Sequence, residues 1–287
     1  MTDEREPHVA MLYRYPVKGL SPESMMHVRL EVGETVPFDR AYAIENGPGR
    51  FDPEAPKHLP KTNFLMLMRD ERLATLETRF DPQTEVLTVS RQGKLVASGA
   101  LNSKIGRQLL EQFFSAYMAD SLRGAPRIVR AEGHSFSDMA AKCLHIVNLA
   151  SVRDLERTIG RPVHPLRFRA NIYLDGVEPW QELSWLDREL SIGGARLSVF
   201  HRTRRCDATN VDPVTAQRDM AIPAALLRTW GHSDFGVYAT VTAAGQIAPE
   251  MSSPSRNRLS SNHSGRTFPS GLTLVSCRSR RHSVTPY

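Results

Sequence analysis

The sequence FHRTRRCDATNVDP, residues 200–213, places a single cysteine beside a cluster of arginines. It follows an alternating apolar run at 197–200 that is typical of a strand, and it ends in an Asp-Pro pair that favours a turn. Cys206 comes directly after Arg204 and Arg205, and fixed cations stabilise a thiolate. Because thiolates attack electrophiles and bind soft metals, Cys206 is the leading candidate for a functional residue. The alternative is that Cys206 only packs, as free cysteines commonly do.

The composition is that of a globular protein. The chain has 287 residues, 40% of them hydrophobic, which is enough for one large or two ordinary domains. The N-terminus shows no basic start followed by an apolar segment, and no apolar run approaches the ~18 residues of a membrane helix. These features predict a cytoplasmic protein without a membrane partner. The three cysteines are far apart and lie outside C-x-x-C pairs, so neither a disulfide framework nor an iron–sulfur cluster is expected.

The net charge of +6 is concentrated at the C-terminal end. Residues 251–287 contain six arginines, no lysine and no acidic residue, which leaves 31 basic and 31 acidic residues in the first 250. The same segment holds ten serines and one short apolar run at 272–275. Because such a composition buries little apolar surface, we expect residues 251–287 to be disordered. A basic tail can bind polyanions weakly, but no specific nucleic-acid partner is expected.

The first hundred residues show the pattern of short strands separated by turns. Apolar runs bounded by proline and glycine predict strands at 9–15, 25–32 and 40–45, and a hairpin formed by 86–90 and 95–98. Gly93 lies in the turn of that hairpin, where a positive φ is favoured. Many short strands with regular turns indicate a small β-barrel.

The remainder of the chain mixes helices and strands. Apolar residues recur at helical spacing from 102 to 117, which predicts the clearest helix. Ser151 with Asp154 three residues later approximates a capping box, so we expect Ser151 to open a helix that ends at Gly160. A further helix is predicted at 222–230, and strands are predicted at 144–149, 171–174 and 235–241.

Several basic residues outside the cysteine segment are candidates for binding an anion. Lys18 ends a predicted strand, where backbone amides and the ammonium group can receive a phosphate, although a solvated surface lysine is the commoner case. Arg40 can pair with Asp39 or turn inward to an anionic ligand. Arg167 and Arg169 are expected to point to the same side of an extended segment, which favours an anion between them, although an exposed pair fits equally.

The cysteine segment resembles the MOSC domain, the fold shared with the C-terminal part of molybdenum cofactor sulfurases. The resemblance rests on Arg205-Cys206 followed by Thr209 and Val211-Asp212-Pro213, and on the segment FRANI at 168–172. The most similar subgroup is the mitochondrial amidoxime-reducing component with its bacterial relatives, and the resemblance covers residues 8–248.

The resemblance implies a mostly β fold with peripheral helices, in the α+β class. An N-terminal MOSC-associated β-barrel domain is expected over residues 8–100 and a MOSC β-barrel over residues 101–250, followed by the basic tail at 251–287. The family's closing Gly-Asp-x-Val segment is absent from this sequence, which puts the last barrel strand in question.

The resemblance also implies a molybdenum cofactor, a pyranopterin dithiolene whose metal is ligated by Cys206. Its phosphate and pterin are expected to be held by Lys18, Arg40, Arg169, Asn171 and Arg205. The chain departs from the family pattern at Gly19 and Arg204, where relatives have serine, and at Ala170, where they have proline.

The activity implied is reduction of N-hydroxylated small-molecule substrates such as amidoximes or hydroxylamines. Because the chain has no cysteines for an iron–sulfur domain, electrons are expected from a separate donor protein. Two alternatives stay open: a sulfurtransferase that carries a persulfide on Cys206, and a non-catalytic carrier that delivers the cofactor to an acceptor.

Overall fold

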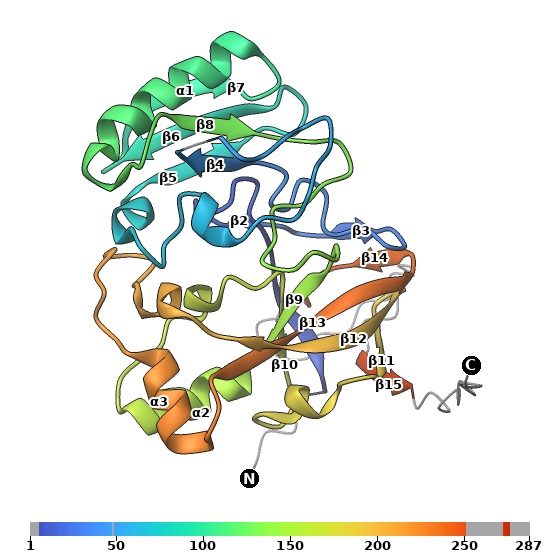
Figure 1. The fold of residues 1–287 in the computed structure, drawn as a ribbon. Coiled ribbons are helices and arrows are strands. Elements are labelled where there is room, and N and C mark those ends of the chain that lie inside the picture. The colour runs from blue at the N-terminus through green and yellow to red at the C-terminus, as the bar shows by residue number, and fades with distance from the viewer. Residues whose placement is uncertain (1–5, 48, 251–271, 276–287) are drawn as a thin grey trace, which may run out of the picture.

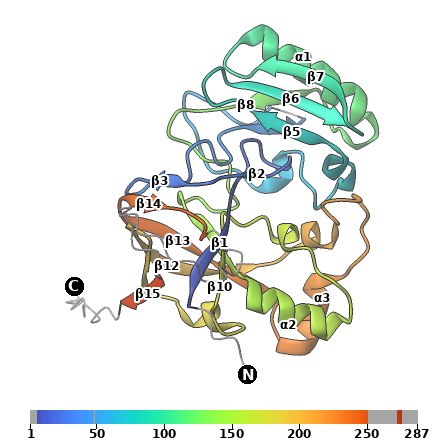
Figure 2. The same cartoon turned by 180° about the vertical axis from the view of Figure 1, so that it is seen from behind.

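The computed structural model describes residues 6–47, 49–250 and 272–275. Figure 1 shows two stacked halves: α1 and the strands β4 to β8 form one, and a curled sheet with α2 and α3 forms the other. Figure 2, the view from behind, shows β1 running from the junction of the halves into the curled sheet. The described residues are mostly strands with three α-helices, which confirms the predicted fold class.

The larger half is built on an eight-stranded sheet in the order β15-β11-β12-β13-β9-β10-β1-β2. In it, β9 and β10 run parallel and the other neighbours run antiparallel. Its strands are β1 (His8–Arg14), β2 (Glu23–Ser24), β9 (Leu144–Asn148), β10 (Ile172–Asp175), β11 (Glu189–Ile192), β12 (Ala195–Arg204), β13 (Asp234–Ala243) and β15 (Leu272–Val275).

Side chains alternate between the two faces of this sheet, as a pleated strand requires. Leu144 and Ile146 of β9 belong to one hydrophobic core, together with residues of β12 and β13. Val147 belongs to a second core on the other face, which includes residues of α2 (Leu149–Ile159) and α3 (Ile222–Trp230). The curled sheet therefore separates two apolar layers.

The smaller half contains an antiparallel sheet of β5 (Glu77–Phe80), β6 (Val86–Arg91) and β7 (Lys94–Ala100), covered by α1 (Lys104–Tyr117). The predicted helix and hairpin are confirmed. Ser103 caps α1 by accepting a hydrogen bond from the Gly106 N–H at 2.9 Å, and Leu110 and Phe114 are fully buried. A Cβ on Gly99 would overlap the carbonyl oxygen of Gly106, so glycine is what lets α1 lie directly on β7.

Two short strand pairs complete the sheets. β4 (Ala43–Asn46) pairs with β8 (Pro126–Val129), and β3 (Val28–Leu30) pairs with β14 (Gly245–Ile247). Short 3-10 helices occur at η1 (Lys61–Asn63), η2 (Glu71–Thr75), η3 (Ala119–Ser121), η4 (Pro165–Phe168), η5 (Gln181–Ser184) and η6 (Asp207–Asn210). Because β3 precedes and β14 follows most of the chain, their pairing joins distant parts of the sequence.

Some predicted strands differ in length from the observed ones. The segment predicted at 25–32 contains only β3, and the segment predicted at 40–45 becomes a strand only at Ala43. Arg40 has a φ of 49°, in the left-handed region, so the backbone turns at this residue instead of extending. β1 joins the curled sheet through β10, although it lies within the first hundred residues. The domain boundaries at residues 100 and 250 stay predictions.

The C-terminal segment contributes one described strand. Leu272–Val275 forms β15, which pairs antiparallel with β11. Residues 272–275 are the part of the segment predicted to be disordered, 251–287, that the structure describes. The rest of that expectation concerns 251–271 and 276–287, which lie outside the described residues. Within the described ranges, no helix has the length and apolarity needed to cross a membrane.

Helix α2 begins earlier than predicted because Asn148 caps it instead of Ser151. The Asn148 side chain accepts a hydrogen bond from the Ala150 N–H at 2.9 Å. Ser151 is buried in the first turn, where its hydroxyl donates to Glu182 at 2.9 Å. Burial raises the pKa of Glu182 to about 7, and the hydrogen bonds from Ser151 and Asn148 offset only part of this effect.

This raised pKa makes stability depend on pH near neutrality. A carboxyl whose pKa rises from 4.5 to about 7 on folding stabilises the folded chain below pH 4.5, and this contribution is lost as pH rises through 7. We predict that the free energy of unfolding falls across this range by on the order of 3 kcal/mol from this group, and that Glu182→Gln removes the fall. Urea unfolding at several pH values measures it. In the control Glu178→Gln, at an exposed position, the free energy of unfolding should still fall with pH as in the parent. A pH dependence in Glu182→Gln equal to that of the parent would contradict the prediction.

Candidate functional site

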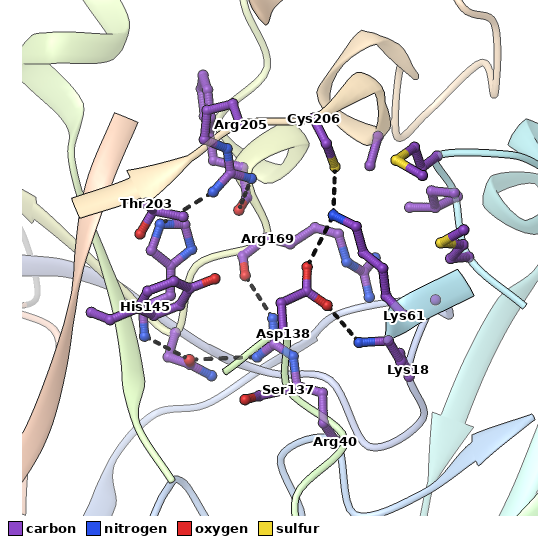
Figure 3. Close-up of a pocket in the computed structure, with 18 of the residues that line it drawn as sticks. Lys18, Arg40, Lys61, Ser137, Asp138, His145, Arg169, Thr203, Arg205 and Cys206 are labelled. Carbon is purple, nitrogen blue, oxygen red and sulfur yellow. Dashed lines mark hydrogen bonds and ion pairs between the residues drawn. The ribbon is translucent and has the colours of Figure 1, made fainter. Parts of the chain in front are cut away.

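A pocket lies where the two halves of the molecule meet, and it is lined by residues from both (Figure 3). Its empty space, including open solvent at the mouth, is about 870 Å³. All the residues predicted for the site line it: Lys18, Arg40, Arg169, Asn171, Arg205 and Cys206. The fold thus brings together residues that are widely separated in the sequence.

Cys206 lies at the end of β12, where the chain turns into η6. It is the N-cap residue of η6, and its carbonyl accepts hydrogen bonds from the Thr209 backbone at 3.0 Å and hydroxyl at 2.9 Å. Its thiol is partly accessible, and the Lys61 ammonium group donates to the sulfur at 3.2 Å. The interpretation of Cys206 as a core packing residue therefore does not hold.

Lys61 and Asp138 extend this contact into a chain of charges (Figure 3). Lys61 Nζ lies 3.4 Å from one oxygen of Asp138, and Lys18 Nζ lies 2.6 Å from the other. Burial acts to lower the pKa of Lys61, but Asp138 and Cys206 outweigh it and raise the pKa. Burial likewise acts to raise the pKa of Asp138, and the two ammonium groups hold it well below its usual range. Lys61 is therefore a cation beside a carboxylate at neutral pH. Burial lowers the pKa of Lys18, and the ion pair with Asp138 opposes this effect.

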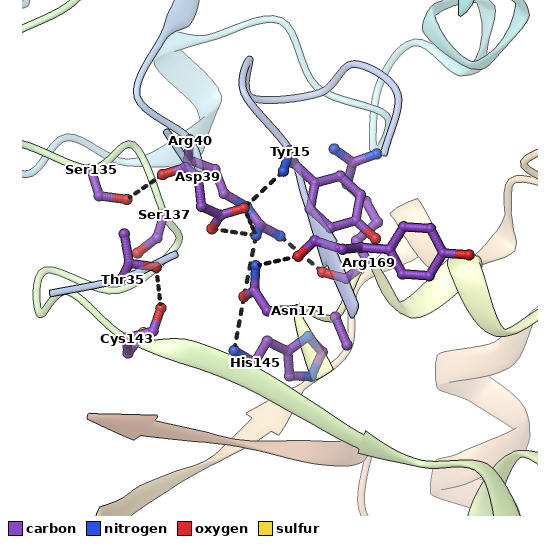
Figure 4. Close-up of polar contacts among 12 residues, drawn as sticks. Tyr15, Thr35, Asp39, Arg40, Ser135, Ser137, Cys143, His145, Arg169 and Asn171 are labelled. Atoms are coloured by element: carbon purple, nitrogen blue, oxygen red, sulfur yellow. Dashed lines mark hydrogen bonds and ion pairs between the residues drawn. The ribbon is translucent and has the colours of Figure 1, made fainter. Parts of the chain in front are cut away.

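Arg40 forms the second ion pair of the pocket, with the buried carboxylate of Asp39 (Figure 4). Its Nη1 lies 2.6 and 2.8 Å from the two carboxylate oxygens, and its Nη2 donates to the Arg169 carbonyl at 2.9 Å. Asp39 also accepts a hydrogen bond from the Tyr15 N–H at 2.8 Å. Burial acts to lower the pKa of Arg40, and Asp39 more than compensates, so the pKa is raised. Arg40 thus pairs with Asp39 and also lines the pocket.

Asn171, which also lines the pocket, forms hydrogen bonds to backbone groups of two strands. Its amide nitrogen donates to the Tyr13 carbonyl at 3.2 Å, and its oxygen accepts from the His145 N–H at 3.0 Å (Figure 4). Asn171 therefore ties β1 to β9 at the base of the pocket.

Arg169 and Arg205 are cations without a carboxylate partner among the described residues. Arg169 stacks on Tyr15 at 4.3 Å and donates to the Leu20 carbonyl at 2.8 Å. Burial lowers its pKa to about 10, so it remains charged at neutral pH. Arg205 donates to the Phe168 carbonyl at 2.9 Å, and its buried Nε has no partner within the described part of the chain. These groups leave positive charge and a hydrogen-bond donor available to a ligand.

Arg167 does not join Arg169 around an anion, so that expectation is wrong. Arg167 is buried and pairs with Asp212 at 2.7 Å and Asp219 at 2.8 Å. The two arginines diverge because residues 165–168 form a 3-10 helix and Arg169 adopts a left-handed φ of 52° instead of an extended conformation.

Two departures from the family pattern have local structural reasons. Gly19 has a φ of 85°, and a Cβ there would lie 2.8 Å from the Leu65 carbonyl oxygen, so a serine would be strained. The N–H of Ala170 donates to the Tyr173 hydroxyl at 3.1 Å, a bond that proline cannot form. Both substitutions suit the backbone of this chain.

Sequence reasoning missed Lys61, Asp138 and His145, which also line the pocket. None lies in a recognisable motif, and each reaches the site through tertiary folding. Burial and the neighbouring Arg205 hold the pKa of His145 well below its usual value. A neutral His145 accepts a hydrogen bond from Arg205 at 3.4 Å, which helps to orient that guanidinium group.

The donor set fits a molybdenum cofactor. Cys206 supplies a soft sulfur ligand, and the cations without carboxylate partners suit an anionic pterin phosphate. The unpartnered donor of Arg205 and the unpartnered hydroxyl of Thr203, another lining residue, are available to polar atoms of the group. Among the described residues, no three His, Cys, Asp or Glu side chains form a metal cluster.

The fold and site define a β-rich protein with a thiol in a cation-lined pocket between two halves. A family model described as the MOSC N-terminal beta barrel domain matches residues 6–120, and the MOSC domain model matches residues 131–251. The chain belongs to the MOSC domain family, and the resemblance inferred from its motifs is confirmed.

Named relatives match over part of their length. The chain is 29% identical over 116 residues to mitochondrial amidoxime reducing component 2 of Rattus norvegicus, covering 36% of this chain and 34% of the relative. It is 34% identical over 101 residues to molybdenum cofactor sulfurase of Caenorhabditis elegans, covering 34% of this chain and 14% of the relative. Among solved structures, the match to the YUAD protein of Bacillus subtilis covers 85% of this chain and 92% of that protein's chain, with 12% sequence identity and a TM-score of 0.41.

We predict that the Asp39 carboxylate is essential for stability. Asp39→Asn keeps the acceptor for the Tyr15 N–H but leaves the Arg40 cation buried without its counter-charge. The expected loss is about 3–5 kcal/mol in the free energy of unfolding, measured by urea denaturation. Glu31→Gln is the matched control, since it removes an exposed pair with Arg29 and should cost at most about 1 kcal/mol. Equal losses in the two variants would show that the Asp39 pair has no special role.

Proposed function

We propose that this protein is a molybdenum-cofactor oxidoreductase that reduces N-hydroxylated small molecules. The observation that carries the proposal is the convergence of a partly accessible thiol, Cys206, with partly buried cations, Arg169 and Arg205, that lack carboxylate partners in the described chain. A relative named as an amidoxime reducing component supports the reaction class. In the reaction, the N–O bond breaks, two electrons and two protons are taken up, and the oxygen leaves as water.

The bound cofactor supplies the redox chemistry, because its metal can change oxidation state by two electrons. In this proposal Cys206 anchors the metal through its sulfur, while Arg169 and Arg205 bind the anionic and polar groups of the pterin. Lys18 and Arg40 contribute further positive charge, balanced by Asp138 and Asp39. Cations that are fixed before the ligand arrives bind it without reorganising.

Lys61 is placed to control charge at the sulfur. Its ammonium group donates to Cys206 and lies beside Asp138, so it stabilises negative charge on the sulfur and holds a proton close to it. Asp138 forms ion pairs with both Lys18 and Lys61, and these pairs hold the Lys61 ammonium group, with its proton, beside the sulfur. The electrons are proposed to come from a separate donor protein.

A second candidate function is sulfur transfer, with Cys206 carrying a persulfide. Relatives named as molybdenum cofactor sulfurases and the ammonium group beside an accessible thiol both favour it. A non-catalytic carrier of the cofactor is the third possibility, and it predicts stoichiometric binding without turnover.

Metal and pterin content of the purified protein is the decisive test. The parent, produced in a host that makes the cofactor, should contain near-stoichiometric molybdenum and pterin and should reduce an arylamidoxime with a chemical electron donor. Cys206→Ala should lose molybdenum or alter its ligation, because the soft ligand is gone. Cys143→Ala is the matched control: Cys143 lines the same pocket but is buried, and burial raises the pKa of its thiol to about 12.

The outcomes separate the three candidate functions. Equal molybdenum loss in the Cys143 and Cys206 variants would indicate a general packing defect instead of ligation. A parent without metal and pterin would overturn the oxidoreductase proposal. A parent that binds the cofactor and reduces no N-hydroxylated compound with any donor would indicate the carrier.

The sulfur-transfer candidate has its own readout. If it is correct, incubation with a sulfane-sulfur donor adds the mass of one sulfur atom to the peptide containing Cys206. Lys61→Met should reduce the yield of this adduct, because the cation that stabilises the anionic sulfur is lost. Intact-protein mass spectrometry before and after reduction measures it, and labelling at Cys143 instead of Cys206 would contradict the assignment.

A further inference from the structure

The charges of the pocket are unbalanced. Among the described residues, six cationic side chains line it, against the two carboxylates of Asp39 and Asp138; the cations are Lys18, Arg40, Lys61, Arg169, Arg204 and Arg205. Three of the six form ion pairs with those carboxylates. Arg169 and Arg205 are anchored by backbone carbonyls and aromatic rings. Arg204 is the remaining cation, and the cofactor interpretation gives it no role.

Arg204 differs from the other cations in its surroundings. It is exposed, and neither an ion pair nor a side-chain hydrogen bond holds it within the described ranges, whereas Lys18 is 8% exposed. It lies on β12 close to Cys206. The pairing of β12 with β13 shifts register between Arg202 and Arg204, and such an irregularity re-aims side chains. This is how buried Thr203 and exposed Arg204, which are adjacent in sequence, both line the pocket.

We propose that Arg204 binds an anionic group of the substrate, so that the preferred substrates are N-hydroxylated compounds carrying a carboxylate. This inference rests on the proposed function. An exposed guanidinium group at the pocket can accept a planar carboxylate through two parallel N–H donors. The buried and partly buried cations are suited to a resident cofactor, whereas an exposed one can exchange ligands at each turnover.

The first experiment compares a neutral arylamidoxime with its para-carboxylate analogue. For the parent, kcat/KM should be higher for the carboxylate. In Arg204→Gln, the ratio of the two values should fall roughly threefold to tenfold, since one charge-assisted contact at an exposed site is lost. Arg204→Lys should keep part of the preference. Arg228→Gln, an exposed arginine on α3 away from the pocket, is the control and should leave the ratio unchanged.

A second experiment needs no electron donor. Titration calorimetry measures binding of the para-carboxylate arylamidine, the reduced product, to the cofactor-loaded protein. Affinity should fall in Arg204→Gln by a similar factor, and the parent's affinity should weaken with added salt because the contact is solvent-exposed. Molybdenum and pterin content is measured in the same samples.

The outcomes distinguish this inference from the proposed function. If the parent reduces both amidoximes and Arg204→Gln leaves their ratio unchanged, the substrate inference fails and the oxidoreductase proposal stands. If Arg204→Gln loses pterin, Arg204 holds the cofactor, and the substrate inference is again overturned. If the parent reduces neither compound but binds the carboxylate through Arg204, the oxidoreductase proposal fails and the anion site stands.

Discussion

The structure depends on keeping several cations close together in one partly buried pocket. Like charges repel strongly where water is excluded. Each cation of the pocket must therefore form an ion pair, stack on an aromatic ring or donate hydrogen bonds to carbonyl groups. Asp39 forms the ion pair that neutralises Arg40, and it also accepts a hydrogen bond from the N–H of Tyr15, the residue that follows β1. Asp138 does the same for Lys18 and Lys61. These two carboxylates make the pocket a stable part of the fold and leave Arg169 and Arg205 with charge available to an anionic ligand.

The pocket requires both halves of the molecule. Lys61 comes from the segment that leads into the N-terminal sheet, Asp138 from the loop between β8 and β9, and Cys206 from the end of β12. Asn171 ties β1 to β9 beneath them. A displacement of one half relative to the other would therefore separate the sulfur from its ammonium partner. The chemistry proposed for the thiol depends on this junction as much as on the MOSC sheet itself.

Local sequence patterns predicted the secondary structure correctly where interactions between neighbouring residues determine it. The helix at α1 followed from its apolar spacing, and the β6–β7 hairpin followed from Gly93. The predictions erred where other interactions intervened. Arg40 turns the backbone at the start of a predicted strand, and Asn148 takes the cap position expected for Ser151. The extended geometry assumed for Arg167 and Arg169 gave way to a 3-10 turn, which sends Arg167 to Asp212 and Asp219.

The sequence by itself determined the family and the mostly β fold class. It also determined six residues that line one pocket, because short motifs with fixed chemistry carry them: Lys18, Arg40, Arg169, Asn171, Arg205 and Cys206. Tertiary structure alone decided that Lys61 and Asp138 join them, that β1 belongs to the curled sheet, and that Arg204 lines the pocket without a partner in the described chain. Such facts depend on contacts between residues far apart in the chain. No local pattern encodes them, since the charge and burial of each group are set by neighbours that only folding brings near.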